Sequence, residues 1–181
     1  MNTATKNLED DHVHILKLTE VMVTITRHEN PDIKHIESIV DIIRNFADGL
    51  HHAKEENLLF PALEQKGFST RQGPVAVMLF EHEEGRNFVK GITENLELFK
   101  NANKHAIDGI FQNMLGYAEL LRNHISKENN ILFRMADNAF TDIEQQQLLE
   151  QFKTVEKNRL EGSKVEDYIE RIKKLAAFYN V

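Results

Sequence analysis

Hydrophobic residues recur every three or four positions along most of the chain, which is the spacing of helices that bury one face. Breaks between these stretches are marked by Asn30-Pro31 and by Gly73-Pro74. Asn30 is a suitable cap for the second stretch, with Pro31 at its first helical position. Gly91, inside the third stretch, either allows close packing or weakens the helix locally. The pattern predicts four long helices and then two shorter ones, over about residues 7–29, 31–61, 74–100, 104–136, 142–158 and 164–179.

The chain has 181 residues, which is enough for one sizeable hydrophobic core. We therefore expect a single all-α domain, in which an antiparallel up-down four-helix bundle spans about residues 8–137. Capping-box signals that begin at Thr141 and Ser163 predict the two additional helices of a C-terminal extension, about residues 141–181. This extension could cap the bundle or form a dimer surface, and a homodimer is compatible with either arrangement.

Two ten-residue segments share one skeleton, HHAKEENLLF at residues 51–60 and HISKENNILF at residues 124–133. Each reads His, three residues, Glu, and ends in Leu-Phe. On an α-helix this spacing puts the imidazole and the carboxylate one turn apart on the same face, so each pair can bind one metal centre. The two pairs are His51 with Glu55 and His124 with Glu128.

The repeat extends backwards along the chain. Asp11-His12 precedes the first segment, and Glu81-His82 precedes the second at nearly the same interval. In an up-down bundle the two helices of each half run antiparallel, so the single His of one helix can meet the His and Glu of the next. His14 is an alternative to His12 that faces another side of the helix, and the shared acidic-His pattern favours His12. The predicted metal ligands are His12, His51, Glu55, His82, His124 and Glu128.

Four imidazoles and two carboxylates are too many for one tetrahedral zinc ion. They suit two octahedral first-row ions, and the richness in imidazole favours iron over manganese, while zinc remains compatible. We expect no Lys or Arg at the corresponding core positions, so two buried carboxylates would be costly unless a cation neutralised them. The sequence therefore predicts a protein that is less stable without metal.

Several polar residues near this set have a simpler interpretation. His52 and Glu56 share the four-residue spacing but fall out of register with the second segment, so we expect them at the helix surface or around the ligands. Arg86, one turn after His82, is expected in a salt bridge at the rim, with pairing to Glu55, Glu128 or an anion as the alternative. Tyr117 is expected to pack in the core. The remaining histidines, His28, His35 and His105, are expected to be solvated.

Composition excludes several classes of function. The chain has no Cys, which excludes disulfides, iron-sulfur ligation and thiolate nucleophiles, so any metal must bind to nitrogen and oxygen. The net charge is -7 and the basic residues are scattered, so neither nucleic acid nor an anionic membrane is an expected partner. No apolar run approaches the roughly 20 residues of a membrane span, and the N-terminal MNTATKNLEDD lacks signal-peptide features. We expect a cytoplasmic protein.

Four motifs, DDH, HHAKEENLLFP, FEHEEGR and HISKENNILF, together resemble the hemerythrin-like, or HHE cation-binding, family over about residues 8–137. The resemblance implies a four-helix bundle around two non-haem iron ions, bridged by oxide or hydroxide and by the carboxylates of Glu55 and Glu128. Related proteins bind oxygen reversibly, sense oxygen or iron, or handle nitric oxide and damaged iron centres. Arg86 and Glu128 stand where oxygen-carrying members have His and Asp. The Cys-bearing N-terminal region of the iron-centre repair branch is absent, which argues against a repair role.

Three functions fit these residues. The favoured one is a non-catalytic di-iron protein that binds oxygen or nitric oxide for sensing, storage or delivery. Sensing would need a separate protein partner for signalling or redox exchange, docked on the last two helices. The alternative is a redox enzyme that handles oxygen, peroxide or nitric oxide, or that repairs iron centres. His52, Tyr117 and Glu56 are its candidate proton donors. The third is a divalent-cation store or a scaffold.

Overall fold

The computed structural model describes residues 3–159 and 164–181, and every regular element within these ranges is helical. This confirms the all-α prediction. The elements, where η marks a π-helical segment, are α1 (Ala4–Ile25), α2 (Ile33–Ile42), η1 (Ile43–His52), η2 (Glu55–Leu59), α3 (Phe60–Gln65), α4 (Pro74–Lys100), α5 (Ala106–Lys127), η3 (Glu128–Leu132), α6 (Phe133–Ala139), α7 (Asp142–Arg159) and α8 (Val165–Tyr179).

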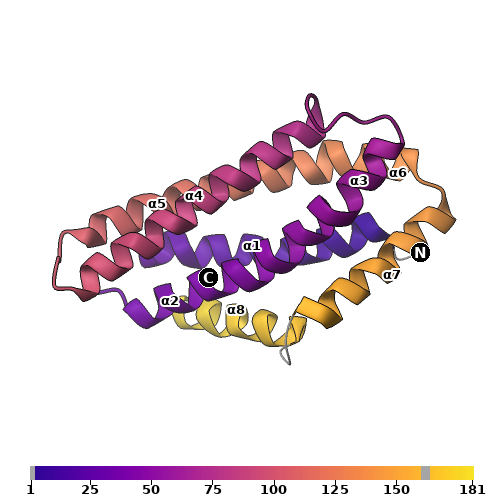
Figure 1. Cartoon of the computed structure of the whole chain (residues 1–181). Coiled ribbons are helices and arrows are strands. Elements are labelled where there is room, and N and C mark those ends of the chain that lie inside the picture. Colours follow the sequence, from indigo (N-terminus) through magenta and orange to yellow (C-terminus); the bar gives the residue numbers. More distant parts are fainter. Residues whose placement is uncertain (1–2, 160–163) are drawn as a thin grey trace.

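Several of these elements join end to end into longer rods. The segments α2, η1, η2 and α3 form one rod, and α5, η3 and α6 form another, because the helical backbone continues from each into the next. With α1 and α4 these rods extend side by side along one long direction (Figure 1). The chain reverses direction between them at residues 26–32, 66–73 and 101–105.

The C-terminal helices pack against the rods. Helix α7 contacts α1, η1 and η2, while α8 contacts α1 (Figure 1). Their apolar residues are buried there, including Phe152 of α7 and Ile172 of α8. The two helices therefore cover one side of the rods, and whether they also form a dimer surface stays a prediction.

Helix starts agree with the sequence at some positions and differ at others. Thr141 and Glu144 cap α7 reciprocally, as predicted. Asn30 is not a cap, because Asp32 lies directly before the first helical residue and its carboxylate accepts the Lys34 amide at 2.9 Å. The predicted cap at Ser163 lies outside the described residues.

Two apolar clusters lie on either side of a polar layer in the interior. The first contains residues such as Ile15, Leu50 and Leu121, and the second contains Leu8 and Leu59. Along the rods, the buried His and Glu residues fall between members of the two clusters. The two apolar clusters thus flank the polar layer.

Candidate metal centre

The two buried glutamates each begin a π-helical segment. The Phe60 amide donates to the Glu55 carbonyl, and the Phe133 amide donates to the Glu128 carbonyl, which are five-residue hydrogen bonds in place of the four-residue bonds expected from the sequence. The expectation of regular α-helix at these positions is therefore wrong. The ring of Phe60 stacks on His82 and that of Phe133 on His12, with centroid distances of 5.9 and 5.5 Å.

The six residues predicted as ligands converge in the polar layer, and each is at most 2% exposed. Two imidazole pairs face each other through their Nε2 atoms. The Nε2 atoms of His12 and His51 are 3.0 Å apart, and those of His82 and His124 are 3.2 Å apart. Neighbouring ligand atoms around an octahedral ion with bonds of about 2.1 Å lie roughly 3 Å apart. Each imidazole pair thus has the spacing of two adjacent ligands.

The carboxylates lie between the two imidazole pairs. Glu128 places one oxygen 3.2 Å from Nε2 of His12 and its other oxygen 3.2 Å from Nε2 of His124. Oε2 of Glu55 lies 3.7 Å from Nε2 of His51 and 3.4 Å from Nε2 of His82. Each carboxylate can therefore bridge two cations, one at each imidazole pair.

All four oxygens of Glu55 and Glu128 are buried without a hydrogen-bond partner. An unpaired buried carboxylate is unstable, because burial removes its water without replacing it. Divalent cations in this position would neutralise both carboxylates, and imidazole and carboxylate groups are ligands that first-row metals accept. The residues present thus fit a pair of metal ions.

The outward-facing nitrogen of each imidazole has an oxygen acceptor. Carboxylates and amide oxygens accept hydrogen bonds, so Nδ1 carries the proton and leaves the Nε2 lone pair directed into the centre. This is the arrangement that metal-binding imidazoles adopt. The four bonds are His12 to Asn129 (2.7 Å), His51 to Asp11 (3.2 Å), His82 to Glu56 (2.7 Å) and His124 to Glu81 (2.9 Å).

These acceptors follow the sequence repeat. Asp11 and Glu81 each directly precede the single His of their half, and Glu56 and Asn129 each directly follow the central Glu. Glu56 therefore belongs to the surroundings of the ligands, which is one of its two predicted places. The matching offsets in the two halves are the signal in the sequence from which the roles of Asp11, Glu81 and Asn129 could have been inferred.

Lys54 corrects the expectation that no basic residue lies in the core. Its side chain is fully buried, and Nζ donates to Asp11 at 2.8 Å, to Asn7 at 2.9 Å and to Glu156 of α7 at 2.9 Å. Lys54 therefore pairs with Asp11, which also accepts from His51. The carboxylates of Glu55 and Glu128 remain free for a cation. Lys127, the equivalent residue of the second half, pairs with Glu81 but is 38% exposed.

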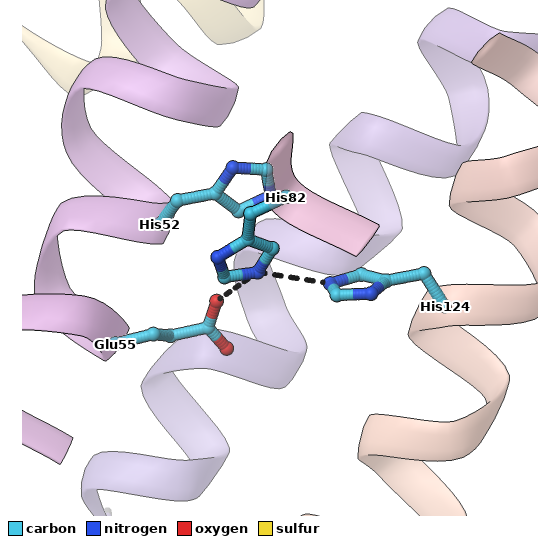
Figure 2. A group of neighbouring side chains, drawn as sticks. All are labelled: His52, Glu55, His82 and His124. Atoms are coloured by element: carbon cyan, nitrogen blue, oxygen red, sulfur yellow. Dashed lines mark hydrogen bonds and ion pairs between the residues drawn. The ribbon is translucent and has the colours of Figure 1, made fainter. Parts of the chain in front are cut away.

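The register of the repeat sets His52 outside the predicted ligands, yet its side chain lies in the same layer. Its ring is buried and stacks on the ring of His82 at a centroid distance of 3.8 Å. His52, Glu55, His82 and His124 each offer a donor atom within 4.8 Å of the others (Figure 2). Burial and the neighbouring imidazoles hold the pKa of His52 well below its usual range, so its ring is neutral.

Arg86 forms the predicted rim salt bridge. It pairs with Asp48 at 2.9 Å and with Glu56 at 2.6 Å, and its side chain is 36% exposed. Burial alone would raise the pKa of Asp48, but hydrogen bonds from His52 and Arg86 lower it to about 2. Asp48 thus stays ionised and holds the Arg86 guanidinium and the His52 ring in place.

Other predicted side chains also have defined positions. His14 is partly exposed, whereas His12 lies in the centre. Tyr117 is buried in the core, as expected. His35 differs from the prediction, because it hydrogen-bonds the Tyr179 hydroxyl at 2.8 Å after α8 packs against this part of the chain.

The negative charge of the two buried carboxylates attracts protons as well as metal ions. Burial alone would lower the pKa of His124, but the charge and hydrogen bond of Glu128, the hydrogen bond to Glu81 and the charge of Glu55 together outweigh burial and raise the pKa to about 10. Burial and Glu128 act in opposite directions on His12, and the net result is also a raised pKa. Protons and metal ions therefore compete for this site.

The profile of the hemerythrin HHE cation-binding domain matches residues 3–136. The chain therefore belongs to the hemerythrin HHE cation-binding family, as its four motifs indicated. None of the described helices is both long and apolar enough to cross a membrane.

Curated relatives are more distant. The uncharacterized protein Rv1995 of Mycobacterium tuberculosis is 24% identical over 131 residues, which cover 72% of this chain and 51% of that protein. The iron-sulfur cluster repair protein YtfE of Escherichia coli O157:H7 is 32% identical over 88 residues, covering 48% of this chain and 40% of YtfE. YtfE of Salmonella schwarzengrund is 36% identical over 92 residues, with the same coverage. The chain thus spans about half or less of these relatives, and no solved structure matches it.

Proposed function

We propose that the chain binds two iron ions, one at His12 and His51 and one at His82 and His124, within an antiparallel up-down four-helix bundle extended by α7 and α8. Glu55 and Glu128 bridge the two positions. The observation that carries this proposal is the set of four buried, unpartnered carboxylate oxygens beside four inward-facing Nε2 atoms. Membership of a cation-binding family supports it.

Iron is the metal that the donor set and the relatives favour together. Imidazole and carboxylate suit iron, manganese and zinc, but six ligands in two octahedral sets suit zinc least. The YtfE relatives are named for the repair of iron-sulfur clusters, so they act on iron centres. Manganese and zinc remain the competitors to include in any test of metal preference.

The function we propose is reversible binding of oxygen or nitric oxide, for sensing, storage or delivery. Bound iron supplies a redox-active Lewis acid with coordination positions left for a small ligand. The protein residues hold it in a buried layer between two apolar clusters and direct the four imidazoles through their Nδ1 hydrogen bonds. Two of the predicted proton donors are already engaged, because His52 donates to Asp48 and the carboxylate of Glu56 accepts from His82 and Arg86. This favours binding over turnover.

A second candidate is a role in the repair of iron centres, because two of the relatives carry that name. The matched segment covers only 40% of those proteins.

The test uses protein loaded anaerobically with iron, with metal content and visible spectrum measured on one sample. We expect about two irons per chain and absorption bands that change with air or nitric oxide and return when the gas is removed. His124→Ala should lose iron, whereas His105→Ala, which changes an exposed histidine, should retain it. Sustained consumption of oxygen or nitric oxide with an electron donor would instead support an enzyme, and no iron uptake would refute both functions.

A further inference from the structure

Helix α7 lies outside the residues that match the family profile, yet it reaches the surroundings of the metal centre. The match ends at residue 136, and α7 begins at Asp142. The helix packs against α1, η1 and η2, which carry His12, His51 and Glu55 (Figure 1). The C-terminal extension therefore lies beside one half of the proposed centre.

A buried polar chain joins α7 to His51. Nζ of Lys54, whose side chain is fully buried, donates to Glu156 of α7 at 2.9 Å and to Oδ2 of Asp11 at 2.8 Å. The same Oδ2 atom accepts from Nδ1 of His51 at 3.2 Å. The third proton of the ammonium group goes to Asn7 at 2.9 Å, so all three donors of Lys54 are used. A change at Glu156 thus reaches a predicted metal ligand through two intervening side chains.

The same helix closes the apolar cover over Lys54. Phe152 of α7 is fully buried, and its ring centroid lies 5.7 Å from Nζ of Lys54. Gln145, also buried, accepts from the Ala4 amide at 3.0 Å and so anchors the start of α7 on α1. If α7 left the rods, the ammonium group would lose Glu156 and this cover together. Docking of α7 therefore determines how strongly Lys54 acts on its other partners.

The charges along this chain give the direction of the effect. Lys54 carries one positive charge between the carboxylates of Asp11 and Glu156, so one negative charge is left over. Without Glu156, Asp11 would be its only charged partner among the described residues, and their bond would strengthen. Because one oxygen of Asp11 is shared by two donors, its hydrogen bond from His51 would then weaken. An imidazole with a weaker outer acceptor is a weaker metal ligand.

The equivalent lysine of the second half lies at the surface. Lys127 pairs with Glu81, which accepts from His124, and 38% of the Lys127 side chain is exposed. Water and salt screen an exposed ammonium group, so it acts weakly on the carboxylate beside it. Of the two lysines, only Lys54 can therefore carry an effect of α7 to an imidazole.

Resting on the proposed function, we infer that α7 regulates the metal position at His12 and His51. Lys54 and Glu156 are positioning residues that act through Asp11. Docked α7 keeps His51 a strong ligand, and release of α7 lowers the metal affinity of this position. Coupling between two equilibria is reciprocal, so metal in this position also favours docked α7. The proposed sensing thereby gains a route from the centre to the outside of the protein.

Metal affinity tests the first direction. Ferrous iron is titrated anaerobically into Glu156→Gln, which removes the charge and keeps an acceptor for Lys54, and free iron is measured by equilibrium dialysis. Substitution of a group directly behind a metal ligand costs roughly 10–100-fold in affinity. Glu156 is two side chains further out and 25% exposed, so we expect a loss of at least about threefold for one of the two irons. Glu150→Gln, which changes an exposed carboxylate of the same helix, should bind both irons like the wild type.

Asn7→Asp supplies a rescue that a merely structural role of α7 would not allow. Its side chain lies 2.9 Å from Nζ of Lys54, so an aspartate there returns a negative charge to the ammonium group without restoring Glu156. Combined with Glu156→Gln, it should recover the iron affinity of the wild type. Failure of this rescue, or equal affinities in Glu156→Gln and Glu150→Gln, would overturn the inference.

Hydrogen exchange tests the reverse direction, because it reports local release of a helix. Iron should slow exchange of the α7 amides in the wild type, measured relative to those of α8, and should slow it less in Glu156→Gln. Exchange in α7 that does not respond to iron in the wild type would contradict the coupling.

Nitrogen NMR of the histidine rings in the metal-free proteins gives a reading that needs no iron. Glu156→Gln should shift the ring signals of His51 and leave those of His124 unchanged. Unchanged His51 signals would overturn the link between α7 and the ligand. A wild type that takes up no iron would refute the proposed function instead.

Discussion

Nε2 of His82 lies 3.4 Å from a carboxylate oxygen of Glu55, although the two residues come from different halves of the sequence repeat. Glu128 makes the reciprocal contact, at 3.2 Å from Nε2 of His12. Each half thus supplies a carboxylate to the imidazoles of the other. Neither half can complete the site alone, so cations at the centre would tie together rods that are far apart in sequence.

Metal should raise the melting temperature, because it neutralises the buried carboxylates of Glu55 and Glu128. At a free metal concentration 100 times Kd, one site contributes about 2.7 kcal/mol, which is a rise of roughly 5–10 °C for a domain of this size. His124→Ala should lose at least half of this rise. Circular-dichroism melts with metal and with a chelator measure it.

The matched control for this prediction is His105→Ala, because His105 is exposed and lies far along the chain from the ligands. It should melt like the wild type under both conditions. A wild-type melting temperature that does not respond to the chelator would show that the centre does not depend on metal for its stability.

Lys54 and Lys127 occupy equivalent positions in the repeat but should differ in their effect on stability. Lys54→Met leaves the buried Asp11 without its cation, and breaking a buried pair in this way costs about 3 kcal/mol or more. Lys127→Met removes a partly exposed pair, which contributes about 0–1 kcal/mol. Urea unfolding of both metal-free variants makes the comparison, and equal losses would contradict it.

Gly91 allows a close approach between α4 and α5. A side-chain carbon there would lie 2.3 Å from Oδ1 of Asn113, whose amide donates to the Gly109 carbonyl at 2.8 Å. Gly91→Ala should therefore lower the free energy of unfolding by about 1 kcal/mol or more, although Gly→Ala in an open helix is normally stabilising.

The same substitution in an Asn113→Ala background tests this explanation. With the amide removed, Gly91→Ala should no longer destabilise the protein, and the coupling between the two sites would appear in the double-mutant cycle. If Gly91→Ala lowers the free energy of unfolding equally in both backgrounds, the contact with Asn113 is not the cause.

The charge of Glu144, at the start of α7, should contribute to the stability of the protein and be lost in acid. Hydrogen bonds from Lys66 and from Thr141 lower its pKa in the folded protein to about 2, from an ordinary value near 4.5. A lowered pKa stabilises the folded state above about pH 4.5, and this contribution is lost as the pH falls toward 2. Glu144→Gln should therefore be less stable than the wild type at pH 6.

Urea unfolding of the metal-free proteins at pH 6, 4 and 3 follows this difference. The stability gap between the wild type and Glu144→Gln should shrink steadily as the pH falls. A gap that stays constant over this range would mean that the charge of Glu144 does not contribute.

Sequence periodicity predicted the helices well, and the reason lies in the local physics of each element. Apolar spacing selects the buried face, and Pro and Gly mark the breaks, so the bounds of α4 and the position of α7 could be inferred without tertiary information. The π-helical turns at Glu55 and Glu128 could not, because the spacing of apolar residues does not distinguish a five-residue hydrogen bond from a four-residue one within a single turn.

The sequence by itself determined which residues could bind metal, because a repeated His and Glu at helical spacing must share a face whatever surrounds it. Tertiary structure decided what lies around them. Lys54 is buried only because α7 brings Glu156 over it, whereas Lys127 has no such cover. His52 lies beside the centre because its ring stacks on His82 and donates to Asp48. Such placements depend on contacts between distant segments, and the spacing of residues along one helix carries no information about them.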